Sequence, residues 1–284
     1  MKWKYLVGDA LEVLSSIPTR SIQCIVTSPP YWGLRDYKIP NSTWDDGWVG
    51  CLGNEPDPDQ YAEHLIEIFN QARNTLKEDA TIWLNIGDSY YNDELVGIPW
   101  LVAFLFRKNG YRIVKDIIWH KPNPPPQNTT SRPVSAHEHI FLISISKNHF
   151  YNPDGFRIPH SRAYIERAKY PMGYNKNKDE NFKTSMRSPN PNGRLVRDVW
   201  SFITAGDREI HPAVFPDELP KRCILLGSNE GDTILDPFAG SGTTIRAARN
   251  LKRNAIGIDI SSTYHNRAND KAMLNVPDIE TFAE

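Results

Sequence analysis

The chain has 284 residues, enough for one large α/β domain or for a domain that carries insertions. Its formal net charge of −1 excludes a uniformly basic nucleic-acid binder but permits a local basic segment. No apolar run approaches the roughly 18 residues of a membrane span, and the N-terminus lacks a signal-peptide core, so we expect no membrane contact. The cysteines Cys24, Cys51 and Cys223 fit neither a disulfide framework nor a zinc pattern, which favours a reducing cytoplasm.

Short apolar runs of strand length alternate with segments of helical spacing along most of the chain. We expect strands at residues 5–9, 22–26, 80–86, 111–119, 138–146, 233–236 and 255–259. We expect helices at residues 10–17, 59–77, 98–108, 217–227, 242–251 and 263–274, and a long loop at 32–58. This alternation predicts an α/β fold with a doubly wound, mostly parallel, seven-stranded sheet.

Residues 151–199 interrupt the alternation with a segment that has no hydrophobic period. Between Phe156 and Arg197, only Glu166, Asp179 and Glu180 oppose the basic residues, which are Arg157, Arg162, Arg167, Lys169, Lys176, Lys178, Lys183, Arg187, Arg194 and Arg197. A basic segment in a chain of nearly zero net charge is typical of a catalytic domain with one part that meets a polyanion. We therefore divide the chain into residues 1–150, an insert at 151–199 and residues 200–284. A merely solvated insert is the alternative.

The segment Asp236-Pro-Phe-Ala-Gly-Ser-Gly-Thr-Thr244 joins an expected strand to an expected helix. Its glycines permit a tight turn in front of unpaired helix N–H groups. It lacks the lysine of a Walker phosphate loop and the third glycine of a dinucleotide fold. Asp236 can accept hydrogen bonds from an α-amino group, and Asp259, at the end of the next strand, can bind ribose hydroxyls. An amino acid joined to a nucleoside is S-adenosylmethionine. For Asp259, a helix-capping position is the alternative, although Ser261 or Ser262 could also cap that helix.

Two rare motifs, Thr27-Ser-Pro-Pro-Tyr-Trp32 and then the glycine loop, together with Gly257-Ile-Asp-Ile260, resemble the amino-methylating DNA methyltransferases. The catalytic motif precedes the cofactor motif, as in the circularly permuted β group, and the resemblance runs from Tyr5 to about Asn269 apart from the insert. It implies the S-adenosylmethionine-dependent methyltransferase fold, double-stranded DNA as partner, and an insert that recognises the target. It places Asp9 near the adenine of the cofactor and residues 211–219 near its methionine end. The cofactor residues expected are Asp9, Ala10, Asp236, Phe238, Ala239, Gly240, Gly242, Thr243, Thr244, Asp259 and Ile260.

The first of these motifs suits methylation of an exocyclic amine, whose lone pair is delocalised into the base. Acceptors aimed at both amine hydrogens favour a pyramidal nitrogen, and Ser28 Oγ and the Pro29 carbonyl can supply them. Pro29 and Pro30 restrict the backbone and add no competing N–H. Tyr31 offers its ring to a base flipped out of the duplex. Methyl transfer would be direct in-line attack, and no cysteine follows a proline as C5 methylation of cytosine would require.

In the family that the chain resembles, Ser at the first motif position usually marks cytosine N4 methylation, and Asp or Asn usually marks adenine N6. Ser28 therefore favours N4-cytosine, with N6-adenine as the alternative because a hydroxyl can both donate and accept. From another class, the rival is a DNA-binding regulator that has lost catalysis, which the intact motifs oppose. The chain leaves no room for a nuclease domain, so a cognate restriction endonuclease would be a separate protein. Both a monomer and a homodimer remain open.

Other conspicuous residues are expected to contact DNA or to support the fold. The expected DNA contacts are Trp32, Lys121, Arg132, Arg187 and Arg194. In His137-Glu-His139, strand alternation puts the histidines on one face and Glu138 on the other, which favours a half-exposed strand over a metal site. Trp44 and Trp48 either close over the flipped base or anchor the long loop.

Overall fold

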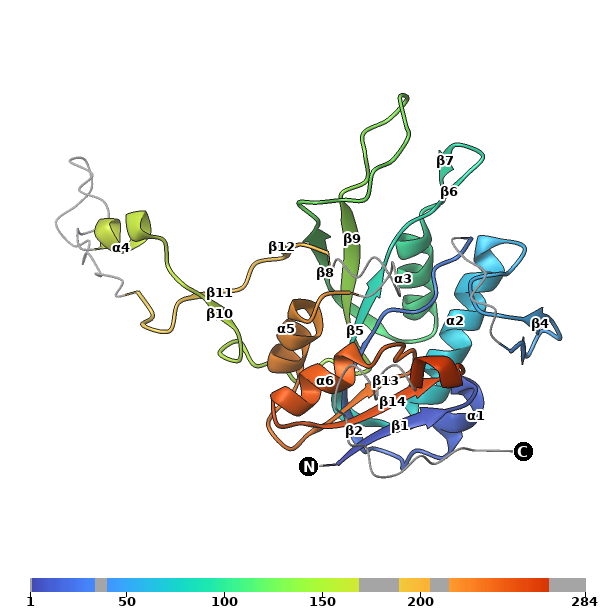
Figure 1. The fold of residues 1–284 in the computed structure, drawn as a ribbon. Helices are drawn as coiled ribbons and strands as arrows, with labels where there is room; N and C mark the ends of the chain where they lie inside the picture. The colour runs from blue at the N-terminus through green and yellow to red at the C-terminus, as the bar shows by residue number, and fades with distance from the viewer. Residues whose placement is uncertain (1, 34–39, 169–188, 205–214, 266–284) are drawn as a thin grey trace. The chain divides into compact units, whose positions relative to one another are not determined.

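The computed structural model describes residues 2–33, 40–168, 189–204 and 215–265, and the chain divides into two compact units. The larger unit is Met1–Tyr151 with Asp198–Glu284, and the smaller unit is Asn152–Arg197. The smaller unit overlaps the expected insert. It contains helix α4 (Arg162–Ala168) and the antiparallel pair β10 (Arg157–Ile158) and β11 (Arg194–Leu195) (Figure 1).

The larger unit is built on an eight-stranded sheet of order β1-β14-β13-β2-β5-β9-β8-β12 (Figure 1). Its strands are β1 (Trp3–Val7), β2 (Ile22–Thr27), β5 (Leu76–Ile86), β8 (Arg112–His120), β9 (His137–Ser144), β12 (Val199–Ser201), β13 (Thr233–Asp236) and β14 (Asn254–Asp259). All neighbours are parallel except β9, which runs antiparallel to β5 and β8. The mostly parallel α/β fold is confirmed. The short β12, which pairs with β8, adds one strand to the seven expected.

Helices cover both faces of the sheet, so the doubly wound prediction is also confirmed. They are α1 (Ala10–Ser15), α2 (Pro58–Arg73), α3 (Ile98–Lys108), α5 (Glu218–Gly227) and α6 (Thr243–Asn250). Ile25 and Ile82 belong to the core cluster shared with α1, α2 and α3. The alternate residues Cys24 and Trp83 face α5, where a Cβ on Gly227 would lie 2.9 Å from Cys24 Sγ and 2.7 Å from Trp83 Nε1. No described helix is long and apolar enough to cross a membrane.

Local sequence explains where α2 begins, and tertiary pairing explains where it ends. Asp57 caps its N-terminus by accepting a hydrogen bond from Gln60 N at 2.9 Å, and Pro58 suits the first turn. The helical spacing predicted a helix to residue 77, but α2 ends at Arg73. Leu76 begins β5 and pairs with Ile22, so burial in the sheet overrides helical periodicity there.

Two other expectations need revision. The loop expected at residues 32–58 contains a short hairpin, β3 (Ser42–Thr43) with β4 (Val49–Gly50), and buries Trp44 and Leu52. A second hairpin, β6 (Tyr90–Tyr91) with β7 (Glu94–Leu95), lies between β5 and α3. The helix expected at 263–274 lies largely outside the described residues.

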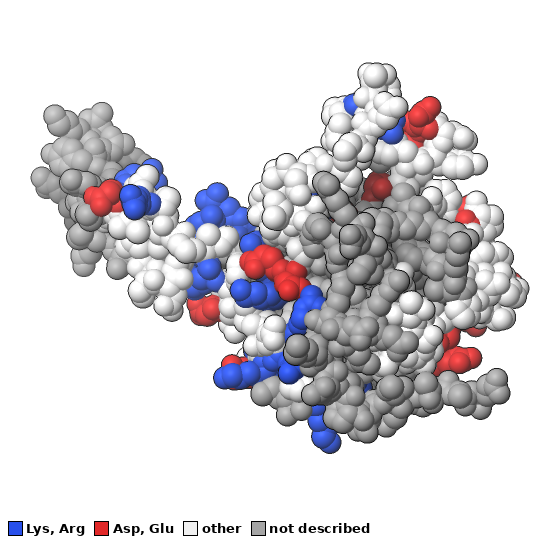
Figure 2. Space-filling view, in the orientation of Figure 1, with Lys and Arg blue, Asp and Glu red and all other residues white. Residues whose placement is uncertain are grey.

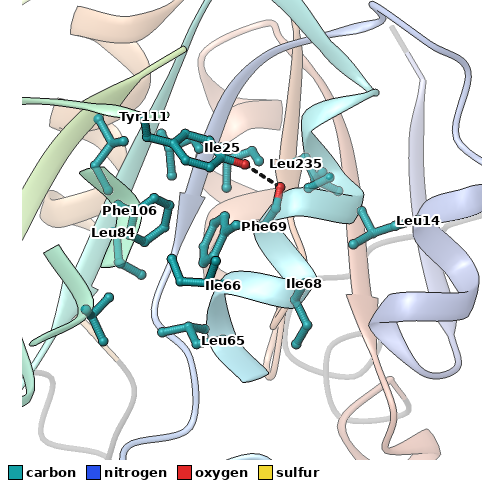
Figure 3. Packing of buried hydrophobic residues seen from close by; sticks show 14 of the residues in the cluster. Leu14, Ile25, Leu65, Ile66, Ile68, Phe69, Leu84, Phe106, Tyr111 and Leu235 are labelled. Atoms are coloured by element: carbon teal, nitrogen blue, oxygen red, sulfur yellow. Dashed lines mark hydrogen bonds between the residues drawn. The ribbon is translucent and has the colours of Figure 1, made fainter. Parts of the chain in front are cut away.

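The core between α2, α3 and the sheet is closely packed (Figure 3). The rings of Phe69 on α2 and Phe106 on α3 lie 5.0 Å apart, and both side chains are fully buried. Tyr111 Oη donates to the Phe69 carbonyl at 2.8 Å (Figure 3). These contacts hold α2 against the sheet.

We expect Phe106→Ala to lower the free energy of unfolding by about 3–5 kcal/mol, because it removes a fully buried ring from a packed core. Phe104 on the same helix is 61% exposed, so Phe104→Ala should change this energy by less than about 0.5 kcal/mol. Urea denaturation of the two variants and the parent checks both values. Equal losses from the two substitutions would contradict this description of the core.

Candidate active site

The two motifs, far apart in the sequence, meet at one edge of the sheet. Strands β2 and β13 are parallel neighbours, with Cys24 opposite Ile234. Their carboxyl ends therefore lie side by side, where ligands bind in open α/β sheets. At this edge Thr27 Oγ1 donates to Asp236 Oδ1 at 2.6 Å. The loops that follow both strands consequently begin from a shared, buried hydrogen bond.

A cavity opens at this edge and is lined by both motifs. Eight expected cofactor residues line it: Asp9, Ala10, Phe238, Ala239, Gly240, Thr243, Asp259 and Ile260. The expected catalytic residues Ser28, Pro29, Pro30 and Tyr31 line the same cavity. Phe215, in the middle of the segment expected near the methionine end, also lines it. Residues 211–214 lie outside the described part of the chain.

Asp259 is held in place by the glycine loop. Its carboxylate accepts hydrogen bonds from Gly240 N and Ser261 N, each at 2.9 Å, while Ser261 takes the capping position considered as the alternative, because its carbonyl accepts from His265 N in the helical turn that follows. Burial raises the pKa of Asp259 to about 6. On the other side of the loop, Tyr5 Oη donates to the Gly240 carbonyl at 2.6 Å. The loop is thus pinned by β1 and β14 before any ligand binds.

Asp236, Gly242 and Thr244 were expected to hold the cofactor, but they do not belong to the cavity lining. Asp236 is 1% exposed, and its Oδ1 accepts from Thr27 Oγ1 and from Phe238 N. Burial raises its pKa to about 6. Thr244 Oγ1 donates to the Val26 carbonyl at 3.3 Å, and Gly242 adopts a φ of 76° in front of α6. These residues shape and join the two loops, a role that the motif alone did not indicate.

The loop after β2 is fixed from three directions. Tyr61 on α2 donates to the Pro30 carbonyl at 2.8 Å, and Ser89 Oγ donates to the Trp32 carbonyl at 2.8 Å. Trp32 was expected at the DNA surface, but its ring is 6% exposed and its Nε1 donates to the Glu55 carbonyl at 3.0 Å. Trp32 is therefore a core anchor of this loop, because the apolar ring gains more from burial than from solvent contact.

Behind Ser28 lies a hydrogen-bonded network that sequence reasoning missed. Ser28 Oγ donates to Tyr31 Oη at 3.2 Å, and Tyr31 Oη donates to Glu138 Oε2 at 2.8 Å. Asn85 Nδ2 lies 2.8 Å from Tyr31 Oη and 2.7 Å from Glu138 Oε2. Lys121 Nζ donates to Glu138 Oε1. Burial, and then the charge of Glu138, raise the pKa of Tyr31 well above its ordinary value.

The other expected DNA contacts differ in their surroundings. Lys121 is partly buried in its ion pair with Glu138, which differs from the exposed phosphate contact expected. Arg132 stacks over the ring of Tyr90 at 3.7 Å. Arg194 lies on β11 of the smaller unit, and Arg187 lies outside the described residues.

Strand β9 is more buried than the half-exposed strand expected, because it lies between β5 and β8. His139 is 9% exposed, and its Nδ1 lies 3.0 Å from Asp116 Oδ1. In the described part of the chain, no three His, Cys, Asp or Glu side chains gather as a metal would require. In the sequence, the feature that could have identified Glu138 as a site residue was its place on the strand face opposite the two histidines.

Trp44 and Trp48 anchor the long loop onto α2. Their rings stack on His64, with centroids 4.2 and 5.3 Å from it. His64 Nδ1 lies 3.0 Å from Glu55 Oε1, and burial raises the pKa of Glu55. Trp44 also lines the cavity, as do Ser42 and Leu52 of the same loop. The anchoring alternative thus describes both rings, and the loop forms a wall that the motifs did not reveal.

The lining fits the nucleoside that the glycine loop predicted. Phe238, Ala239 and Ile260 offer apolar surface for a planar base, while Asp259 and Asp9 offer carboxylates. Asp9 is already oriented, because its carboxylate accepts from Leu11 N and from Ser42 Oγ. Apolar walls with a few placed acceptors are typical of cofactor sites.

Comparisons with known proteins agree with this geometry. A family model described as DNA methylase, of the N6 and N4 type, matches residues 22–270. The Type II methyltransferase M.SmaI of Serratia marcescens is 33% identical over 95% of this chain and 90% of its own length. M.Cfr9I of Citrobacter freundii, also a Type II methyltransferase, is 32% identical over 90% and 83%.

Solved structures show the same fold. The PvuII DNA methyltransferase, described as cytosine-N4-specific, superposes with a TM-score of 0.71 at 17% identity, over 97% of this chain and 88% of its own. A DNA modification methylase of Thermus thermophilus, solved with S-adenosyl-L-methionine and described as putative, gives 0.64 at 24% identity over 99% of both chains. S-Adenosylmethionine is the methyl donor of these enzymes. With the family match over most of its length and relatives above 30% identity, this chain belongs to the DNA methylase family of N6- and N4-methyltransferases.

Proposed function

We propose that this enzyme methylates the exocyclic N4 amine of a cytosine that is flipped out of duplex DNA into the cavity. The observation that carries the proposal is the place of Ser28. It lines the same cavity as Asp259 and Gly240, so an amine beside its hydroxyl would lie close to the methyl donor. A base within a duplex cannot reach such a cavity, hence the flipping step.

The residues of the chain would act on the amine by positioning it. S-Adenosylmethionine supplies an electrophilic methyl group when bound. Ser28 Oγ would accept one amine hydrogen and the Pro29 carbonyl the other, which turns the nitrogen lone pair out of conjugation. The loop is fixed by Tyr61, Ser89 and the buried Trp32, so these acceptors need little rearrangement when the base arrives.

The residue type at the first motif position supports cytosine as the target. This chain has Ser28 there, whereas adenine enzymes usually have Asp or Asn. The PvuII enzyme, described as cytosine-N4-specific, shares the fold, but its 17% identity bears on the fold alone. Ser28 therefore carries the choice of base. The curated relatives are Type II methyltransferases, which supports a role in modification beside a separate cognate endonuclease.

Contacts to the DNA backbone are proposed for Arg132 and for the basic side chains of the smaller unit. On the face drawn in Figure 2, the larger unit carries both basic and acidic side chains, so no uniform positive field covers the described part of that face. Arg162 and Arg167 are exposed on the smaller unit. Exposed cations of this kind neutralise the phosphates of DNA.

We expect Ser28→Ala to lower the turnover number roughly 100-fold, because it removes a preorganised contact to the reacting amine. The affinity for S-adenosylmethionine should stay nearly unchanged. Single-turnover assays on unmethylated DNA, with calorimetry for the cofactor, measure the two quantities. Ser15→Ala, at an exposed position of α1, is the control and should match the parent. Equal losses of turnover and cofactor affinity would refute the role of Ser28.

Mass spectrometry of nucleosides from DNA treated with the enzyme should give N4-methylcytosine. Methylation sequencing of the same DNA then gives the recognition sequence. N6-methyladenine as the product would overturn the target base while leaving the enzyme class intact.

Because burial raises the pKa of Asp259 to about 6, cofactor binding should weaken as the pH falls through about 6. The ionised carboxylate accepts stronger, charge-assisted hydrogen bonds from ribose hydroxyls than the protonated form does. Calorimetric titration with S-adenosylmethionine between about pH 5 and pH 8 measures this step. Asp259→Asn should bind weakly at every pH and lose the step. The pKa of Asp236 is also raised to about 6. If the pH dependence of cofactor binding persists in Asp259→Asn but vanishes in Asp236→Asn, its assignment to Asp259 is wrong.

A further inference from the structure

A serine hydroxyl can donate or accept a hydrogen bond, so Ser28 by itself does not distinguish an amine from a carbonyl. The network behind Ser28 removes this ambiguity. It consists of Tyr31, Asn85, Glu138 and Lys121, which come from four different segments around the sheet. The directions of its hydrogen bonds follow from counting hydrogens.

The count starts at Glu138, because an ionised carboxylate only accepts. Its Oε1 accepts from Lys121 Nζ, and both side chains are only 14% exposed. Its Oε2 faces Tyr31 Oη at 2.8 Å and Asn85 Nδ2 at 2.7 Å, and both must donate. The raised pKa of Tyr31 keeps the phenol protonated and able to do so.

The direction then passes to Ser28. Tyr31 has one hydroxyl hydrogen, which goes to Glu138, so its oxygen can only accept from Ser28 at 3.2 Å and from Asn85 at 2.8 Å. The two hydrogens of Asn85 Nδ2 serve its two shorter contacts, since Ser28 Oγ is farther away at 3.4 Å. The single hydrogen of Ser28 therefore points to Tyr31. Its lone pairs remain for the cavity that Ser28 lines.

The backbone keeps the network in register. Ile86, next to Asn85, pairs with His139, next to Glu138, on the antiparallel strands β5 and β9. A Cβ on Gly87 would lie 2.7 Å from Tyr31 Cε2, so the absence of a side chain there leaves room for the ring to reach Glu138.

We propose that Glu138, held by Lys121 and Asn85, is a positioning residue that makes Ser28 Oγ a pure acceptor and so selects a base with an exocyclic amine over one with a carbonyl. The inference rests on the proposed function in taking Ser28 as the contact to the target base. It holds for cytosine and for adenine alike. With uracil or hypoxanthine in the cavity, Ser28 Oγ would face the carbonyl oxygen of the base. Neither oxygen would then have a hydrogen-bond donor, so both would stay unpaired.

Two variants test the chain of donors. Tyr31→Phe keeps the ring but removes the acceptor for the Ser28 hydrogen. In Glu138→Gln, Lys121 retains the amide oxygen because lysine only donates, which turns the amide N–H groups toward Tyr31. In both, the Ser28 hydrogen becomes free to point into the cavity. We expect each variant to lower the turnover number on the order of tenfold, with little change in cofactor affinity.

The decisive measurement is the affinity for duplexes that carry the mapped recognition sequence with either the target base or its carbonyl counterpart. The counterpart is uracil for cytosine or hypoxanthine for adenine. The parent enzyme should prefer the amine, and both variants should reduce that preference on the order of tenfold. A merely structural loss would weaken both duplexes equally, and that result would overturn the proposal.

A double variant separates this inference from the proposed function. If Glu138 acts through Ser28, Glu138→Gln should cause no further loss in a Ser28→Ala background. Multiplying losses would overturn the inference while leaving the role of Ser28 intact. Full activity of Ser28→Ala alone would overturn the proposed function. Asp232→Asn breaks a comparable ion pair with Lys77 elsewhere, 2.7 Å long, and should leave turnover and base preference at parent values.

Discussion

The hydrogen bond between Thr27 and Asp236 joins residues 209 positions apart and sets the geometry on which the site depends. It becomes possible because β2 and β13 are parallel neighbours whose carboxyl ends lie at the same edge. The loop proposed to meet the target base starts on one side of it, and the loop proposed to meet the cofactor starts on the other. A methyl group travels only a short distance between two substrates, so this joint determines whether they can meet.

Around that joint, hydrogen bonds and stacked rings within the protein hold the loops that form the cavity. Trp32, Tyr61 and Ser89 fix the catalytic loop, and Tyr5 fixes the glycine loop. The stacked Trp44 and His64 hold the wall contributed by the long loop. Preorganisation of this kind reduces the rearrangement needed at the moment of reaction. When no covalent intermediate is involved, the rate of methyl transfer to a weak nucleophile depends mainly on such positioning.

Much of the site was predictable where the chemistry depends on contiguous residues. Ser28, Tyr31 and Gly240, which were selected from their motifs, line one cavity. The structure differs from the expectation where a side chain finds its partners inside the protein. Trp32 and Lys121 were expected at the DNA but lie buried or partly buried, and Asp236 lies outside the cavity lining. Periodicity also extended α2 past Arg73, because it does not detect the strand pairing of Leu76 with Ile22.

By itself, the sequence determined the fold class, the order of the catalytic and cofactor motifs and the residues proposed to contact each substrate. These are local properties, set by the alternation of apolar residues and by short motifs. Only the tertiary structure placed Asn85 and Glu138 behind Ser28, because they come from strands far apart in the chain that become neighbours in the sheet. The direction of a hydroxyl depends on such neighbours, since a serine accepts or donates according to the groups around it.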